Sequence, residues 1–129
     1  MRRLMPGILL SMCLIAVQAP APAIAQKPAE PQDCSSATTT AAMRTCEIAR
    51  YAKAERELRV VYSELSGKSD PAARTKLNAS QSAWEQFRVA NADFHADTAR
   101  DGTMAPLLRN TALAEMTEAR VAELKQMLH

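Results

Sequence analysis

The 129-residue chain has few of the residues that build β-sheets or catalytic sites. From Cys34 onward apolar and polar residues do not alternate as in strands, and Ala, Glu, Arg, Leu and Met dominate. The chain has three glycines, no glycine-rich phosphate loop, and two histidines, of which only His95 is internal. These absences predict an all-α protein that is not an enzyme and needs no cofactor or metal.

A charge excess is also missing once the N-terminal segment is set aside. Arg2 and Arg3 precede an apolar stretch, and "AIA" at 23–25 provides the small residues that signal peptidase requires, so residues 1–25 are predicted to be a signal peptide cleaved after Ala25. The exported chain, residues 26–129, then has 16 − 2 = 14 basic and 14 acidic residues. Its near-zero net charge argues against nucleic-acid binding.

Two alternatives exist for the N-terminal segment. A membrane anchor is disfavoured because the apolar run is shorter than the roughly 20 residues that a spanning helix needs, and Pro20 and Pro22 end it. Lipid attachment at Cys13 is disfavoured because bulky Met12 precedes it and because Cys13 lies within the apolar run. We therefore expect a periplasmic or secreted protein without stable membrane insertion after cleavage.

Loss of the signal peptide leaves two cysteines, Cys34 and Cys46. An even pair in an exported protein favours a disulfide, which stabilises a fold of this kind by roughly 3 kcal/mol. A metal site is the alternative, but it needs further ligands, and His95 and His129 are distant in sequence.

The rest of the chain divides at two breaks, "SGKSDP" at 66–71 and "RDGTMAP" at 100–106. Residues 26–33 are Pro-rich and polar and are predicted to be a mobile leader. Residues 34–129 are predicted to form one domain, an antiparallel bundle of three long helices at about 37–65, 71–99 and 104–127. Gly67 is expected to end the first helix.

Three of the five aromatic residues, Trp84, Phe87 and Phe94, lie in the second predicted helix. They follow a 4-3 rhythm with Leu77 and Asn91, as residues on one helix face do. A small domain has few other large side chains to bury, so a place in the core is favoured over a ligand-binding stripe.

The order of these motifs resembles the LprI-type lysozyme-inhibitor domain of the bacterial envelope. The resemblance begins with Cys34 and Cys46 and continues through three further tracts, "YAKAERELRVVYSEL" at 51–65, "LNASQSAWEQFR" at 77–88 and "EMTEARVAEL" at 115–124. The chain departs from the pattern at Glu55 and Arg59, where the family commonly has Asp and Asn. The family's later cysteine pair falls near Ala92 and Ala112, which implies that these two positions face each other.

The resemblance supports structural roles for the matching residues Leu58, Tyr62, Trp84, Arg88 and Arg120, and for Glu55 at the position where the family commonly has Asp. Arg88 follows Trp84 by one helical turn and is expected to lay its guanidinium over the indole. A buried Arg120 needs a carboxylate partner, for which Glu55 is the candidate.

The resemblance implies a protein partner, possibly lysozyme, whose two catalytic carboxyl groups lie in a cleft that an inhibitor can block. The candidate contact is the acidic segment with Asp93, Asp97 and Asp101 that leads to Gly102, although ordinary solvated charge also explains it. A metal site in "DFHAD" at 93–97 is disfavoured because His95 points away from the two aspartates on a helix. The alternative function is a structural or adaptor module that contacts another envelope protein through the basic face of the first helix.

Overall fold

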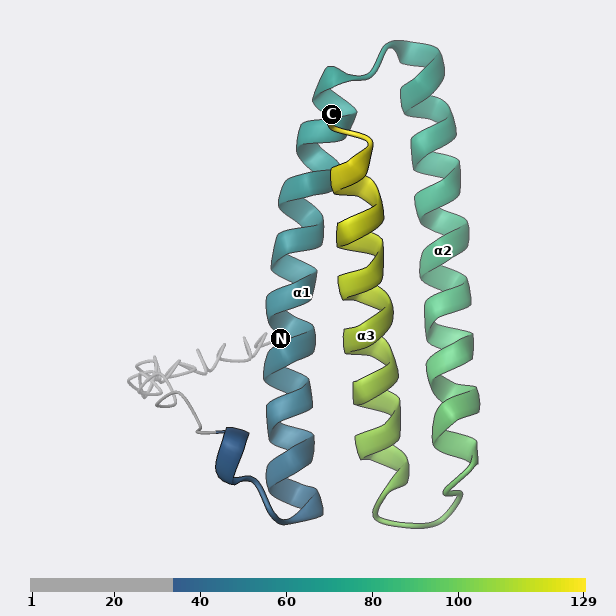
Figure 1. The fold of residues 1–129 in the computed structure, drawn as a ribbon. Helices are drawn as coiled ribbons and strands as arrows, with labels where there is room; N and C mark the ends of the chain where they lie inside the picture. The colour runs from purple at the N-terminus through teal and green to yellow at the C-terminus, as the bar shows by residue number, and fades with distance from the viewer. Residues whose placement is uncertain (1–33) are drawn as a thin grey trace, which may run out of the picture. The chain divides into compact units, whose positions relative to one another are not determined.

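The computed structural model describes residues 34–129, which form three long α-helices and one short 3-10 helix, with no strand in this range (Figure 1). The elements are η1 (Cys34–Ser36), α1 (Thr40–Lys68), α2 (Pro71–Asp97) and α3 (Ala105–Gln126). The prediction of an all-α antiparallel three-helix bundle is therefore confirmed, with helix ends within about three residues of those expected from the sequence. The predicted signal peptide and leader lie outside the described residues.

Local side-chain contacts determine where α1 and α2 begin. The hydroxyl of Thr39 accepts a hydrogen bond from the Ala42 amide (3.1 Å), and the Asp70 carboxylate accepts one from the Ala73 amide (2.8 Å). Pro71 then occupies the first turn of α2, where its missing N–H costs nothing. Gly67 does not end α1 as predicted, because the helix continues through Lys68.

Helix α3 packs against both other helices, whereas the backbones of α1 and α2 approach each other much less closely (Figure 1). One apolar cluster joins Leu58 and Val61 of α1 to Val121 and Leu124 of α3, and Trp84 packs against its edge. Because α3 supplies half of this cluster and touches α2 along its other side, it is the central element of the bundle.

A second buried cluster contains Ala92 of α2 with Ala112 and Leu113 of α3. Ala92 is fully buried and Ala112 is 5% exposed. The two positions where the family pattern has cysteines therefore share one cluster, as the family resemblance implied. Alanine at both positions lets the helices pack there without a covalent link.

The prediction that the aromatic residues of α2 lie in the core is wrong for both phenylalanines. Phe87 and Phe94 are 60% and 70% exposed, and only Trp84 packs against the core. The face of α2 that points inward instead contains Gln81, Arg88 and Ala92. The side of α2 that carries the phenylalanines thus points away from α3. Two polar residues, Gln81 and Arg88, occupy inward positions that the hydrophobic pattern did not predict to be buried.

Candidate partner-binding site

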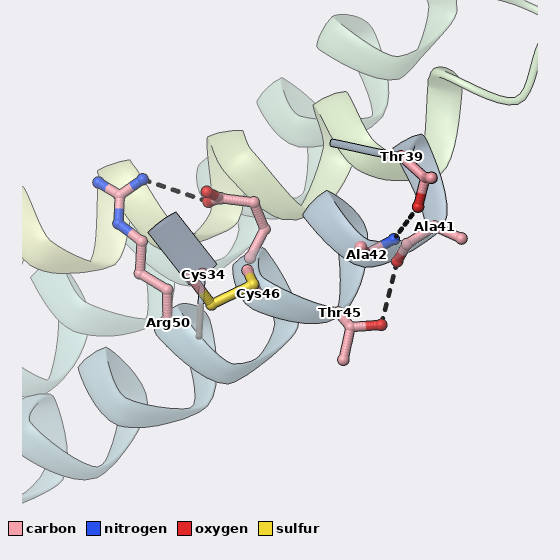
Figure 2. Close-up of a disulfide and its surroundings, with 8 residues drawn as sticks. Cys34, Thr39, Ala41, Ala42, Thr45, Cys46 and Arg50 are labelled. Carbon is pink, nitrogen blue, oxygen red and sulfur yellow. Dashed lines mark hydrogen bonds and ion pairs between the residues drawn. A yellow bond between two sulfur atoms is a disulfide. The ribbon is translucent and has the colours of Figure 1, made fainter. Parts of the chain in front are cut away.

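The disulfide lies where the chain enters the bundle (Figure 2). Cys34 and Cys46 are bonded, with 5.7 Å between their Cα atoms, so the predicted pairing is confirmed. Cys46 is buried on α1 while Cys34 is exposed on η1. The bond therefore fixes the segment preceding α1 to the second turn of that helix, and the Thr39 cap lies between the two anchoring points.

The α2–α3 connection lies at the same end of the bundle as the start of α1 (Figure 1). The Thr40 hydroxyl is 3.7 Å from the sulfur of Met104, which places the two segments side by side. A shallow groove of about 520 Å³ lies between them and is lined by Thr40, Ala41, Arg44, Thr103 and Pro106. We call this region, residues 39–44 and 98–106, the turn end.

Successive short-range backbone hydrogen bonds form the turn itself. The amides of Ala99, Arg100 and Gly102 donate to carbonyls three residues earlier, at 2.9–3.2 Å. Asp101 has φ 62°, the left-handed region that aspartate tolerates better than most residues, whereas Gly102 does not have a positive φ. The unusual backbone conformation at the tip therefore belongs to Asp101, and its carboxylate is exposed.

Two of the three predicted acidic residues are already paired within the chain. Asp97 accepts two hydrogen bonds from the Arg100 guanidinium, each at 2.7 Å, and Asp93 accepts one from Arg109 at 2.7 Å. Among residues 34–129, Asp101 has no ion pair with another side chain. Asp101 thus carries an unpaired negative charge at the tip of the turn, while Arg44, on the α1 side of the turn end, carries a positive charge that has no ion pair within residues 34–129.

A buried polar cluster joins the three helices at mid-height, centred on Trp84. The guanidinium of Arg88 lies 4.7 Å from the indole centroid, as predicted, and that of Arg120 lies 5.7 Å from it. Arg88 is also 5.4 Å from the Tyr51 ring. Both arginines are less than a tenth exposed, so these cation–π contacts form away from bulk water, where they are strongest.

The carboxylate partner predicted for Arg120 is wrong. Glu55 pairs with Arg88, which also donates to the Thr117 hydroxyl at 3.0 Å. Arg120 instead donates to Ser80 (3.0 Å), Gln81 (3.3 Å) and Glu123 (2.8 Å), groups on α2 and on its own helix. The reason is positional, because Arg88 projects from α2 toward α1 whereas Arg120 projects from α3 toward α2.

The other two residues of the sequence motif also have structural positions. Leu58 is buried in the cluster between α1 and α3. The Tyr62 hydroxyl donates to the Asn78 side chain at 2.5 Å and so bridges α1 and α2. Next to it lies a polar groove of about 250 Å³ between these helices, which Glu55, Arg59 and Glu85 also line.

Surface charges near the disulfide titrate differently from free side chains. Arg50 of α1 donates to both carboxylate oxygens of Glu118 on α3, at 2.6 and 2.8 Å, and to Glu47 at 3.2 Å. The hydrogen bonds from Arg50 lower the pKa of Glu118 below its usual value.

The partly buried Tyr51 also has a shifted pKa. Burial raises the pKa of Tyr51 above its usual value, since the charged phenolate is disfavoured away from water.

Sequence reasoning missed two members of the buried polar cluster, Gln81 and Thr117. Thr117 is fully buried, and its hydroxyl donates to the Leu113 carbonyl at 2.6 Å while accepting from Arg88. A signal was available, because Gln81 and Thr117 both belong to the matched motifs and fall one turn from Trp84 or Arg120. Both side chains accept hydrogen bonds from buried arginines, Gln81 from Arg120 and Thr117 from Arg88.

Within residues 34–129, no group of three or more His, Cys, Asp or Glu side chains is arranged to hold a metal ion. None of the three helices is sufficiently apolar over its length to be a membrane-spanning segment. The described grooves are shallow and open, and the polar cluster is occupied by its own ion pairs. The fold of residues 34–129 is therefore that of a small, disulfide-linked helical bundle.

The comparisons with known proteins identify the family of this chain. The sequence model of the family described as Lysozyme inhibitor LprI matches residues 32–124, and the chain belongs to that family. An uncharacterised protein of Rhizobium meliloti (strain 1021) is 34% identical over 142 aligned positions, covering 99% of this chain and 96% of the relative. No solved structure matches the chain.

Proposed function

We propose that this protein is exported and inhibits a lysozyme-like muramidase by binding it through the turn end. Membership of the lysozyme-inhibitor family across residues 32–124 carries the proposal. Lysozymes cleave a glycosidic bond with two carboxyl groups in a cleft, so a protein that covers the cleft inhibits without chemistry of its own.

The turn end has three properties that suit such a contact. It projects from one end of a rigid bundle, its starting segment is fixed by the Cys34–Cys46 bond, and its tip carries the exposed carboxylate of Asp101. Met104, which is 42% exposed, adds an apolar side chain beside the tip. A negative charge at a rim position increases the rate of encounter with a basic partner, which many lysozymes are.

The test is a bacterial-cell turbidity assay with the exported, oxidised protein and several types of lysozyme, together with a binding titration. We expect saturable inhibition that Asp101→Asn weakens by a factor of about 2–5, more at low than at high salt. Asparagine also tolerates the left-handed backbone, so the turn is preserved. Glu115→Gln is the matched control, because Glu115 is exposed, lies on α3, and has no ion pair within residues 34–129.

Folded, disulfide-bonded protein that binds no lysozyme contradicts the inhibitor proposal. If the Asp101→Asn and Glu115→Gln variants inhibit equally, the protein is still an inhibitor, but its contact with lysozyme does not lie at the turn end. The two variants therefore separate the activity from the location of its surface.

The alternative adaptor function is favoured by one observation on α1. Lys53 and Arg56, which lie one helical turn apart, are exposed and have no ion pair with another side chain of residues 34–129, whereas Arg50 and Arg59 do. An acidic envelope protein is the partner that such a face suits. A pull-down that Lys53→Glu and Arg56→Glu abolish, with lysozyme inhibition absent, would support it.

A further inference from the structure

The outer face of α2 differs from the rest of the surface in its lack of charge. On this helix, Glu85 is the only exposed charged residue between Lys76 and Asp93, and it lines the groove toward α1. By contrast, the exposed positions of α1 carry charges along its whole length. We define the outer face by eight exposed residues, Lys76, Ala79, Ala83, Gln86, Phe87, Ala90, Phe94 and Asp97.

Both phenylalanines of the chain lie on this outer face, and they are 60% and 70% exposed. They are seven residues apart, two helical turns, so they point in nearly the same direction. Small side chains at Ala79, Ala83 and Ala90 lie beside them and leave space for another helix to approach closely. A helix face that is uncharged between its two ends and carries two exposed aromatic rings is typical of a protein interface.

We propose that the outer face of α2 binds the same face of a second copy of this chain, with the two helices antiparallel. A two-fold axis between Gln86 and Phe87 places Phe87 opposite Gln86 of the second copy, next to the axis. Phe94 then lies opposite Ala79 of the second copy, and Ala83 lies opposite Ala90 of the second copy. Because the axis is two-fold, every such contact forms twice.

Charge at the two ends of the outer face identifies a second copy as the partner. In the same register Lys76 lies opposite Asp97 of the second copy, and Asp97 lies opposite its Lys76. The ammonium of Lys76 has no ion pair within residues 34–129, and Asp97 is half exposed although it already bonds to Arg100. A parallel arrangement would place like charges together, so the charge distribution selects the antiparallel one.

The dimer leaves the turn end and the basic residues of α1 accessible on each copy, since neither belongs to the outer face. It therefore does not depend on the proposed lysozyme inhibition. The two ideas can fail separately, because one concerns self-association and the other concerns binding to a muramidase.

The experiment is sedimentation velocity and equilibrium on the exported, oxidised protein at about 1–200 µM. We expect a monomer–dimer equilibrium that Phe94→Ser weakens by about 100-fold and that Lys76→Glu or Asp97→Lys weakens by at least about tenfold. The double variant Lys76→Glu/Asp97→Lys should recover most of the affinity, because it exchanges the two charges. Controls are Val60→Ser, an exposed apolar residue of α1, and Lys53→Glu, an unpaired cation of α1.

A protein that stays monomeric throughout this concentration range overturns the proposal. So does a dimer that Phe94→Ser and Lys76→Glu leave unchanged, or a double variant no tighter than the single ones. Circular dichroism should show all variants folded, since each change is at an exposed position. A monomer whose binding to lysozyme is lost with Phe94→Ser would assign the outer face to that partner instead and also overturn the dimer.

Discussion

Replacing Glu55 by glutamine tests the buried polar cluster most directly. Arg88 is 8% exposed and Glu55 is its only carboxylate partner within residues 34–129, so Glu55→Gln leaves a positive charge in a nearly dry site. Removing one member of a buried ion pair costs about 3–5 kcal/mol. The Glu55 side chain is 24% exposed and the aromatic contacts of Arg88 remain, so we expect about 3 kcal/mol of lost stability. For a domain of this size the melting temperature should fall by roughly 12–24 °C.

Replacing the other partner, Arg88, should cost less stability. In Arg88→Met the apolar side chain fills much of the same volume, and Glu55 keeps Arg59 at 3.6 Å as a partially solvated partner. The double variant Glu55→Gln/Arg88→Met contains no buried unpaired charge, so it should be more stable than Glu55→Gln alone.

Urea denaturation, followed by helical circular dichroism and by the fluorescence of Trp84, the single tryptophan, measures all three variants. Glu57→Gln is the control, because its pair with Lys125 is about half exposed and should contribute less than about 1 kcal/mol. The reasoning is refuted if Glu55→Gln costs no more than this control, or if the double variant is no more stable than Glu55→Gln.

Three further predictions concern the cross-links of the bundle. Cys34→Ser/Cys46→Ser should lower the free energy of unfolding by roughly 3 kcal/mol, and an equal stability of the oxidised wild type and this variant in urea would contradict it. Ala92→Cys/Ala112→Cys should form a second disulfide and raise stability by up to about 3 kcal/mol; free thiols found by titration in the folded protein would show that the two positions do not meet. Glu118→Gln should cost less than about 1 kcal/mol at neutral pH, because the side chains of its pair with Arg50 are 38% and 44% exposed and solvent screens the interaction. The lowered pKa of Glu118 means that this contribution is present above the ordinary value of 4.5 and is lost as pH falls through the folded pKa, so a wild-type advantage that persists at pH 2 would refute it.

The helices were predictable because their signals are local. Asp70-Pro71 at the start of α2 and the polar breaks between helices specify the ends by hydrogen-bonding and backbone geometry within a few residues. The disulfide followed from cysteine number and the expected export. These features depend little on which helix faces pack together.

The orientation of α2 was not predictable from the hydrophobic pattern. Its inward positions include Gln81 and Arg88, which look like surface residues in sequence, while Phe87 and Phe94 look like core residues. Burial of an arginine depends on partners from other helices, here Glu55 and Thr117, and the sequence alone does not reveal that three helices bring them together. For the same reason Glu55 was matched with the wrong arginine.

At the turn end, the residues were predictable but their charge balance was not. Asp97 and Arg100 are neighbours in sequence, and their pairing was foreseeable from helical spacing. The pairing of Asp93 with Arg109 depends on how α3 returns after the turn. Only the structure shows that, of the three aspartates of this segment, Asp101 is the one without an ion pair within residues 34–129.

The central position of α3 has a consequence for the order in which the protein acquires its fold. A ribosome or a secretion channel delivers α1 and α2 first, yet Leu58 and Val61 pack against Val121 and Leu124, which emerge last. Until then α1 and α2 lack their main packing partner, and Arg88 lacks the Thr117 hydroxyl to which it donates. The long-range contacts of the bundle can therefore form only after α3 has been delivered, which makes the last helix of the chain the one that completes the fold.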